Sequence, residues 1–129
     1  MSVQDFREKS FWLAADPYEP RPPLAGDLDV DVAIVGAGFT GMSTAYHLHE
    51  ADPSLRIALL EAGVVGYGAS GRNAGFSMTK IGMMHSFTAT RFGKAKAREA
   101  HLYADRAVTL LKGLVEDLDL DCDYEHTGF

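Results

Sequence analysis

The sequence predicts an α/β fold: a parallel β-α-β unit of the doubly wound type, followed by a long amphipathic helix. A short apolar run rich in β-branched side chains, residues 30–35, predicts a central strand covered on both faces. A helical pattern follows over about 40–51 and is broken at Asp52-Pro53-Ser54. A second apolar run at 57–60 completes the unit. Since a whole doubly wound domain has five or six strands, the sequence predicts part of one.

Three glycines follow the first strand directly, as Gly36, Gly38 and Gly41. In this motif the first glycine allows a tight turn, the second leaves space for a pyrophosphate, and the third lets the helix pack on the strand. The helix start offers free N–H groups to a diphosphate. Glu61, twenty residues beyond Gly41, can accept both hydrogen bonds from an adenosine ribose diol, and its charge disfavours NADP. Residues 31–61 therefore predict a Rossmann-like dinucleotide site; the alternative is a β-α-β unit that binds no nucleotide.

A second glycine-rich stretch follows Glu61, with five glycines among residues 62–75. Ordering such a stretch costs much conformational entropy, which favours a backbone that approaches a ligand closely. Ser70 and Arg72 add a hydroxyl and a guanidinium that could hold phosphate oxygens or the edge of a flavin. The alternative is a flexible solvent loop. Beside the first motif, the ligand interpretation is favoured.

Residues 1–29 form an arm rich in proline and aromatic side chains. Four of the five prolines lie there, at Pro17, Pro20, Pro22 and Pro23. They exclude a regular helix or central strand beyond about Ala15. The aromatic side chains provide apolar area to anchor the arm. The sequence predicts a short helix near Val3–Leu13 and then an extended strap on the folded body; the alternative is an arm that reaches a partner subunit.

Composition excludes several classes of protein. The net charge of −6 and the pI near 5.2 provide no basic surface for nucleic acid or an anionic membrane. No apolar stretch approaches the ~20 residues that span a bilayer, and the N-terminus carries charges instead of a signal-peptide core. These features predict a cytoplasmic protein without a membrane span. Cys122 is the only cysteine, and none of the five histidines has metal-ligand spacing, so no metal site is predicted.

The C-terminal part predicts one long amphipathic helix over about Ala95–Leu118. Its apolar stripe consists of Ala100, Ala104, Ala107, Leu110, Leu111, Leu114, Val115 and Leu118. We interpret the stripe as a core face, with a helical partner as the alternative. A strand is predicted through Tyr124–Phe129. Before the helix, Met83-Met84-His85 is interpreted as filling core gaps instead of lining a cofactor cavity.

The segments GAGFTGMSTAYHL, LLEAG and GASGRNAGF together resemble the amino-terminal part of the D-amino-acid oxidase-like family of FAD-dependent oxidoreductases. The preceding SFWLAADPYEPRPPLAGDLDVDV resembles the subgroup that contains gamma-glutamylputrescine oxidase. The resemblance implies FAD as cofactor and oxidation of an amine or amino-acid C–N bond to an imine. It assigns no catalytic residue within this chain.

The resemblance also implies which residues bind FAD. Those around the pyrophosphate are Gly36, Gly38, Phe39, Thr40 and Gly41. Those at the adenosine ribose are Glu61 and Ala62. Those along the path to the isoalloxazine are Ser70, Gly71, Arg72, Asn73 and Ala74. Ala74 stands where the family often has a glycine, so the local contact to the flavin is less defined there.

The implied organisation is an arm at 1–29, an FAD-binding unit with its glycine-rich loop at 30–90, and a long helix with the start of a substrate domain at 91–129. A chain of 129 residues is short for the whole enzyme, so we expect an amino-terminal part without turnover of its own. The alternatives are part of an NAD-linked dehydrogenase and a noncatalytic subunit or truncated fragment that needs a second chain.

Overall fold

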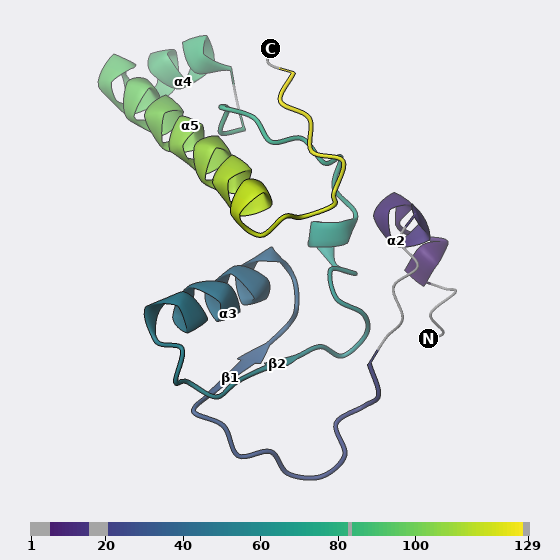
Figure 1. Ribbon diagram of the computed structural model, residues 1–129. Helices are drawn as coiled ribbons and strands as arrows, with labels where there is room; N and C mark the ends of the chain where they lie inside the picture. The colour runs from purple at the N-terminus through teal and green to yellow at the C-terminus, as the bar shows by residue number, and fades with distance from the viewer. Residues whose placement is uncertain (1–5, 16–20, 83, 128–129) are drawn as a thin grey trace. The chain divides into compact units, whose positions relative to one another are not determined.

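The computed structural model describes residues 6–15, 21–82 and 84–127, which form two compact units divided between Ala74 and Gly75. The first unit contains helix α2 (Phe11–Ala15), strand β1 (Val32–Val35), helix α3 (Phe39–Ala51), strand β2 (Ile57–Leu60) and the short 3-10 helix η1 (Ala69–Gly71) (Figure 1). The second contains helices α4 (His85–Phe92) and α5 (Lys94–Asp117).

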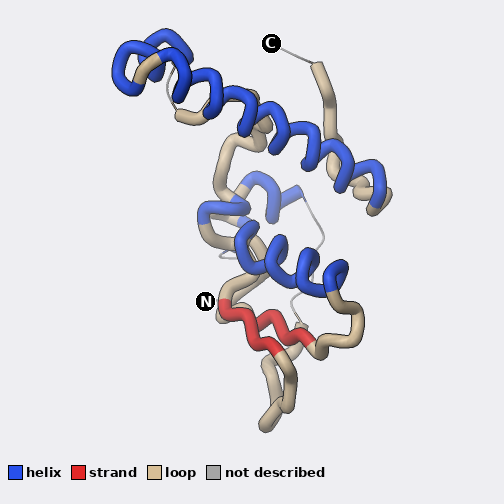
Figure 2. The backbone as a smooth tube through the Cα atoms, turned by 90° about the vertical axis from the view of Figure 1, so that its left-hand side faces the viewer, coloured by secondary structure: helices blue, strands red, loops and turns tan. Residues whose placement is uncertain are grey.

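Strands β1 and β2 pair in parallel, with Val32 opposite Ile57 and Val35 opposite Leu60. Helix α3 connects them and lies along the pair (Figure 2). At the strand starts, the Arg56 guanidinium lies 2.9 Å from an Asp31 carboxylate oxygen. The hydrogen bonds from Arg56 lower the pKa of Asp31 to about 2. The predicted order of strand, helix and strand is confirmed, and an exposed charged pair lies at the start of the two strands.

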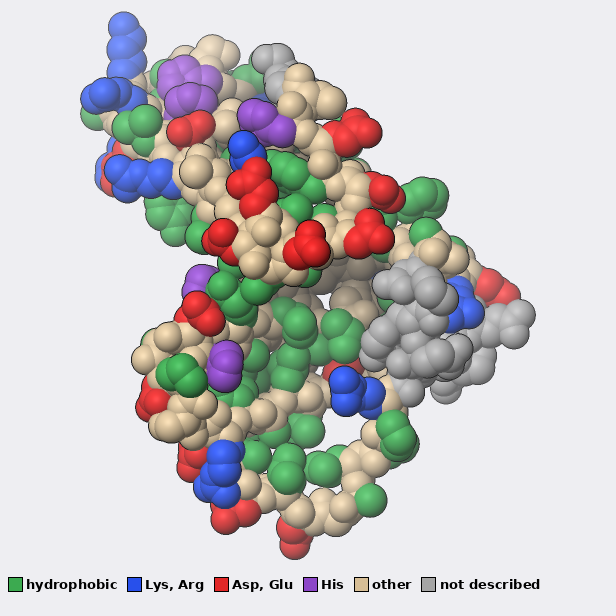
Figure 3. Space-filling model, in the orientation of Figure 1, with side chains coloured by type: hydrophobic (Ala, Val, Ile, Leu, Met, Phe, Trp, Pro, Cys, Tyr) green, Lys and Arg blue, Asp and Glu red, His purple; other side chains and the backbone are tan. Residues whose placement is uncertain are grey.

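One face of β1 is open. Val35 is 86% exposed, whereas Val32 and Ile34 on the opposite face are half-buried. The prediction of a strand covered on both faces is therefore wrong for the described residues. In this unit α3 is the helix packed on the two strands, and a single helix covers a single face. Hydrophobic side chains accordingly reach the surface in the space-filling view (Figure 3).

The described part of the arm is helical in two short pieces, where the sequence predicted one helix. Residues 6 and 7 are helical, and a new helix, α2, starts after Ser10. The Ser10 hydroxyl accepts a hydrogen bond from the Leu13 N–H at 3.2 Å, which is the arrangement of a helix N-cap. Residues 21–30 contain no helix or strand, as the prolines predict, while the predicted helix start at Val3 lies outside the described residues.

Helix α5 begins one residue before its predicted start and ends one residue before its predicted end. Ala104 on the predicted core face is buried, but Leu110 is 55% exposed and Leu111 is also exposed. The core-face prediction is therefore wrong for Ala107, Leu110, Leu111 and Leu118, which are exposed, whereas Leu114 and Val115 are half-buried. Helix α4 packs against α5, and Ala97 and Ala100, in the first half of α5, line a pocket of this unit. Among the described helices, none combines the length and the hydropathy that crossing a bilayer requires.

The strand predicted from Tyr124 is not formed in the described residues. Residues 118–127 contain no strand or helix, and residues 128–129 lie outside the description. Asp119 and Asp123 have φ values of 48° and 50°, which turn the chain away from an extended path. The described residues of the second unit contain no strand that could supply ladder hydrogen bonds to this segment.

Candidate cofactor-binding site

The glycine turn after β1 has the geometry that the motif predicts. Gly36 has φ of +98°, a conformation that favours glycine, and its N–H donates to the Leu60 carbonyl at 2.7 Å. A Cβ on Gly41 would lie 1.9 Å from the Gly36 carbonyl oxygen and 3.3 Å from Leu59 Cδ1. The tight turn and the close approach of helix to strand are both confirmed.

Gly38 lies where the second glycine-rich stretch reaches the start of α3. The Phe39 N–H donates to the Ser70 hydroxyl oxygen at 2.9 Å, and a Cβ on Gly38 would lie 2.9 Å from the same oxygen. The first N–H groups of a helix have no intrahelical partners and attract anions. The structure therefore brings a hydroxyl, a bare glycine backbone and a helix start together, a combination that fits a diphosphate.

Ala37, which is 1% exposed, connects the two glycine-rich segments through its backbone. Its N–H donates to a Glu61 carboxylate oxygen at 2.8 Å, and its carbonyl accepts from the Gly66 N–H at 2.9 Å. The other Glu61 oxygen accepts from the Gly63 N–H at 2.9 Å. The hydrogen bonds from Ala37 and Gly63 lower the pKa of Glu61 below its ordinary value of 4.5.

Sequence reasoning missed this second role of Glu61. The carboxylate was predicted only as a ribose ligand, yet it bridges the first turn and the loop that follows β2. Its spacing from Gly63, two residues on, is compatible with a local hydrogen bond, but no sequence pattern marks the contact with Ala37. Each carboxylate oxygen has further acceptor capacity, so the bridge and a ribose contact are compatible.

We expect Glu61→Gln to loosen the link between the two glycine segments. Glutamine keeps one acceptor oxygen, but its NH₂ group would face a backbone N–H and the charge-assisted bond would be lost. FAD affinity should fall about tenfold, which corresponds to about 1.4 kcal/mol. Isothermal titration with FAD measures the change.

The pH dependence provides the check on this prediction. Because the pKa of Glu61 is lowered on folding, its stabilising effect is present above about pH 4.5 and is lost as pH falls through the lowered value. The wild-type protein should therefore lose more stability over that acidic range than Glu61→Gln does. Parallel acid-unfolding curves for the two proteins would contradict the bridge.

The remaining predicted site residues lie along the loop to Ala74. A Cβ on Gly71 would lie 2.3 Å from the Gly66 carbonyl oxygen, so the loop crosses itself closely there. The Arg72 guanidinium lies 5.0 Å from the centre of the Tyr67 ring, and Arg72 Nε donates to the Gly68 carbonyl at 3.2 Å. Arg72 thus contacts its own loop.

Other predicted positions are exposed beside these contacts. Asn73 Nδ2 donates back to the Ala69 carbonyl at 3.3 Å. Three further predicted residues are exposed: Thr40 in the first turn of α3, Ala62 next to Glu61, and Ala74 at the end of the first unit. Their contacts with FAD remain predictions.

The arm adds residues that the predicted site did not include. Phe6, Ser10 and Trp12 all contact the loop between Gly63 and Asn73. A serine directly before the apolar run FWLAA is a helix N-cap signal, and it could have indicated a helix break at Ser10. It would not have indicated which loop the arm contacts.

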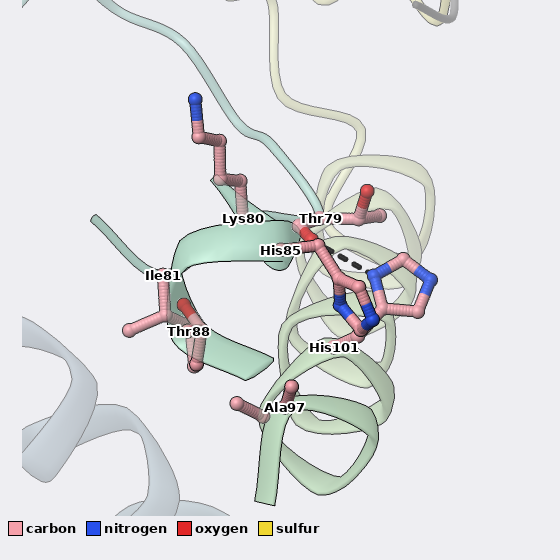
Figure 4. Close-up of a pocket in the computed structure, with 8 residues that line it drawn as sticks. Thr79, Lys80, Ile81, His85, Thr88, Ala97 and His101 are labelled. Carbon is pink, nitrogen blue, oxygen red and sulfur yellow. Dashed lines mark hydrogen bonds between the residues drawn. The ribbon is translucent and has the colours of Figure 1, made fainter. Parts of the chain in front are cut away.

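The second unit has a shallow pocket of its own, between residues 79–81, α4 and the first half of α5 (Figure 4). The His85 and His101 rings lie beside each other there, 6.2 Å between centres, and Lys80 points away from them. His101 Nδ1 lies 3.1 Å from the Thr79 carbonyl oxygen. Met84 is 66% exposed, so the prediction that it fills the core is wrong, and Met83 lies outside the described residues.

Comparison with known proteins identifies the family. The family model described as FAD dependent oxidoreductase (DAO) matches residues 31–129. Gamma-glutamylputrescine oxidoreductase of Escherichia coli is 32% identical over 120 residues, which cover 92% of this chain and 28% of that protein. The beta subunit of sarcosine oxidase from Rhodobacter capsulatus is 31% identical over 98 residues, covering 76% and 20% respectively.

A third relative is a probable oxidoreductase of Haemophilus influenzae, 29% identical over 81% of this chain and 24% of its own length. The chain spans about a quarter of the length of these relatives. No solved structure matches it significantly. The family match covers most of the chain, including both glycine segments and Glu61. The chain belongs to the DAO family of FAD-dependent oxidoreductases, and its cofactor is FAD.

Proposed function

We propose that the chain carries the FAD-binding part of an oxidoreductase that oxidises a C–N bond of an amine or amino acid to an imine. The Ser70 hydroxyl, 2.9 Å from the Phe39 N–H, carries the proposal because it joins both glycine segments at one helix start. The names of two relatives support an amine substrate. One name contains gamma-glutamylputrescine and the other sarcosine, and both compounds have C–N bonds.

The proposed FAD contacts follow the order of the chain. We assign the diphosphate to the start of α3, the adenosine ribose to the end of β2, and the path towards the isoalloxazine to the glycine-rich loop. The residues of these three groups are Gly36, Gly38, Phe39, Thr40 and Gly41; Glu61 and Ala62; and Ser70, Gly71, Arg72, Asn73 and Ala74. In this proposal the Glu61 oxygens bind ribose hydroxyls while they keep the Ala37 and Gly63 N–H groups.

When bound, FAD supplies a two-electron acceptor for oxidation of the C–N bond, and water hydrolyses the imine product. The residues described here position the cofactor's ADP end. Since the chain spans about a quarter of its relatives' length, we infer that the substrate-binding groups belong to the remainder of the enzyme. That remainder belongs either to the same polypeptide or to a second chain. The name of one relative, a beta subunit, supports the second arrangement.

The test is flavin content. We expect the purified protein to be yellow, with the two visible absorption bands of oxidised flavin, and to release FAD on denaturation. Chromatography of the released cofactor distinguishes FAD from FMN, and incubation of the apoprotein with NAD serves as the control. A colourless protein that takes up NAD and not FAD would remove the proposal and leave the dehydrogenase alternative.

A further inference from the structure

The arm segment Phe6–Ala15 packs on the first part of the loop Gly63–Asn73. Phe6 is 7% exposed, and its ring meets the Tyr67 ring edge-on, with 4.3 Å between centres. A Cβ on Gly63 would lie 3.1 Å from Phe6 Cζ, so the glycine admits the ring at close range. A residue near the start of the chain therefore provides core packing for the glycine-rich loop.

Two polar contacts hold the other end of the same loop. The Ser10 hydroxyl donates to the Gly71 carbonyl, and Trp12 Nε1–H donates to the Asn73 carbonyl at 2.9 Å. Each bond joins residues 61 positions apart. Ser10 is 4% exposed, and a buried hydroxyl of this kind is normally hydrogen-bonded. The arm thus supplies hydrogen-bond donors to two backbone carbonyls of the loop.

The position of these bonds matters because Gly71 follows Ser70 directly. Ser70 is the residue whose hydroxyl meets the Phe39 N–H at the start of α3. A loop with this many glycines loses much conformational entropy when it is ordered, so contacts from outside the loop determine how firmly Ser70 is held. The arm therefore contacts the loop at Gly71, and the neighbouring residue Ser70 contacts the start of α3.

We propose that residues 6–15 form a clasp that fixes the glycine-rich loop and slows the release of FAD, with Ser10 and Trp12 as positioning residues. The inference rests on the proposed function, because the loop must contact FAD for the clasp to affect it. Neither residue touches the cofactor in this proposal; both act through the carbonyls of Gly71 and Asn73.

Two substitutions test the clasp. Trp12→Phe keeps an aromatic ring and removes the N–H donor, and Ser10→Ala removes the hydroxyl. Ser10→Ala should speed FAD release from the holoprotein about tenfold, the effect of losing one part-buried hydrogen bond, and Trp12→Phe, which loses an exposed hydrogen bond, should speed it less. Ser10→Thr retains a hydroxyl and should release FAD at a rate closer to wild type than Ser10→Ala. Glu8→Ala, an exposed change in the same segment, is the matched control.

A second measurement needs no FAD. In the apoprotein, trypsin cleavage after Arg72 should be faster in Ser10→Ala and Trp12→Phe than in wild type, while cleavage after Lys80, in the second unit, should be unchanged. Mass spectrometry of the early fragments separates the two sites. Faster cleavage at both sites would indicate general unfolding; because Ser10 also caps α2, Trp12→Phe is then the deciding variant.

The outcomes separate the two proposals. Faster FAD release together with faster Arg72 cleavage supports the clasp. Wild-type values for both in Trp12→Phe overturn it while flavin binding stands, and faster cleavage with unchanged release overturns its role in holding FAD. If the wild-type protein binds no FAD, the proposed function fails, and the inference about FAD release fails with it. Arg72 cleavage then still reports whether the arm holds the loop.

Discussion

A Gly38→Val protein should fold and yet fail to retain FAD. The new Cβ would lie 2.9 Å from Ser70 Oγ, and the two Cγ methyl groups would extend further into the space at the start of α3. Gly38 has φ of −85°, which valine adopts readily, so the backbone itself is not strained. We expect FAD affinity to fall at least ~100-fold, which corresponds to about 2.7 kcal/mol.

Gly68→Ala is the control for this change. It adds a methyl group to the second glycine-rich stretch, where nothing lies within 4 Å of the new Cβ. Its flavin content should match that of the wild-type protein, measured as the ratio of flavin to protein absorbance after gel filtration with FAD. If a folded Gly38→Val protein keeps full flavin content, the assignment of the diphosphate to this turn is wrong.

Gly41→Ala should damage the fold before it affects any ligand. The new Cβ would lie 1.9 Å from the Gly36 carbonyl oxygen, a backbone atom that cannot move without shifting β1 or α3. Severe overpacking of this kind costs about 3 kcal/mol or more, and for a unit of this size that lowers Tm by more than ~10 °C. Calorimetry measures the loss of stability, and hydrogen exchange of the β1 and β2 amides localises it.

Gly113→Ala makes the same chemical change inside α5, where nothing lies within 4 Å of the new Cβ. Alanine has the higher helix propensity, so the second unit should gain about 0.5–1 kcal/mol. If Gly41→Ala lowers stability and Gly113→Ala raises it, then packing against the strand, and not helix propensity, determines the effect of the substitution at Gly41. Equal stability of Gly41→Ala and wild type would contradict the close contact.

The β-α-β unit was predictable because its signals are local. An apolar strand, a glycine turn and a helical segment ended by Asp52-Pro53-Ser54 each leave a pattern within a few residues, and the roles of Gly36 and Gly41 follow from the glycine pattern. The hydrogen bond between Glu61 and Ala37 spans 24 residues and depends on a side-chain rotamer, so no periodicity encodes it. The sequence therefore indicated which residues belong to the candidate site, but it did not indicate which of them are hydrogen-bonded to one another.

The exposed leucines of α5 illustrate a different limit. Spacing identifies which face of a helix is apolar, but it does not identify what covers that face, and Leu110 and Leu111 are exposed in the described structure. Residues 124–127, the described part of the predicted strand, form no strand for a related reason: a strand depends on a partner strand, and the pattern of one segment does not reveal its partner. Helix α5 itself was predictable because its hydrogen bonds are internal.

The long separation between Ser10 and Gly71 also bears on the order in which the chain folds. The arm is synthesised before its partners Gly71 and Asn73, which follow both strands and α3 in the chain. Contacts between distant segments form late because closing a long loop is entropically unfavourable. The arm residues are therefore expected to reach their native contacts after the β-α-β unit has formed, and the aromatic side chains of the arm stay accessible to chaperones until then.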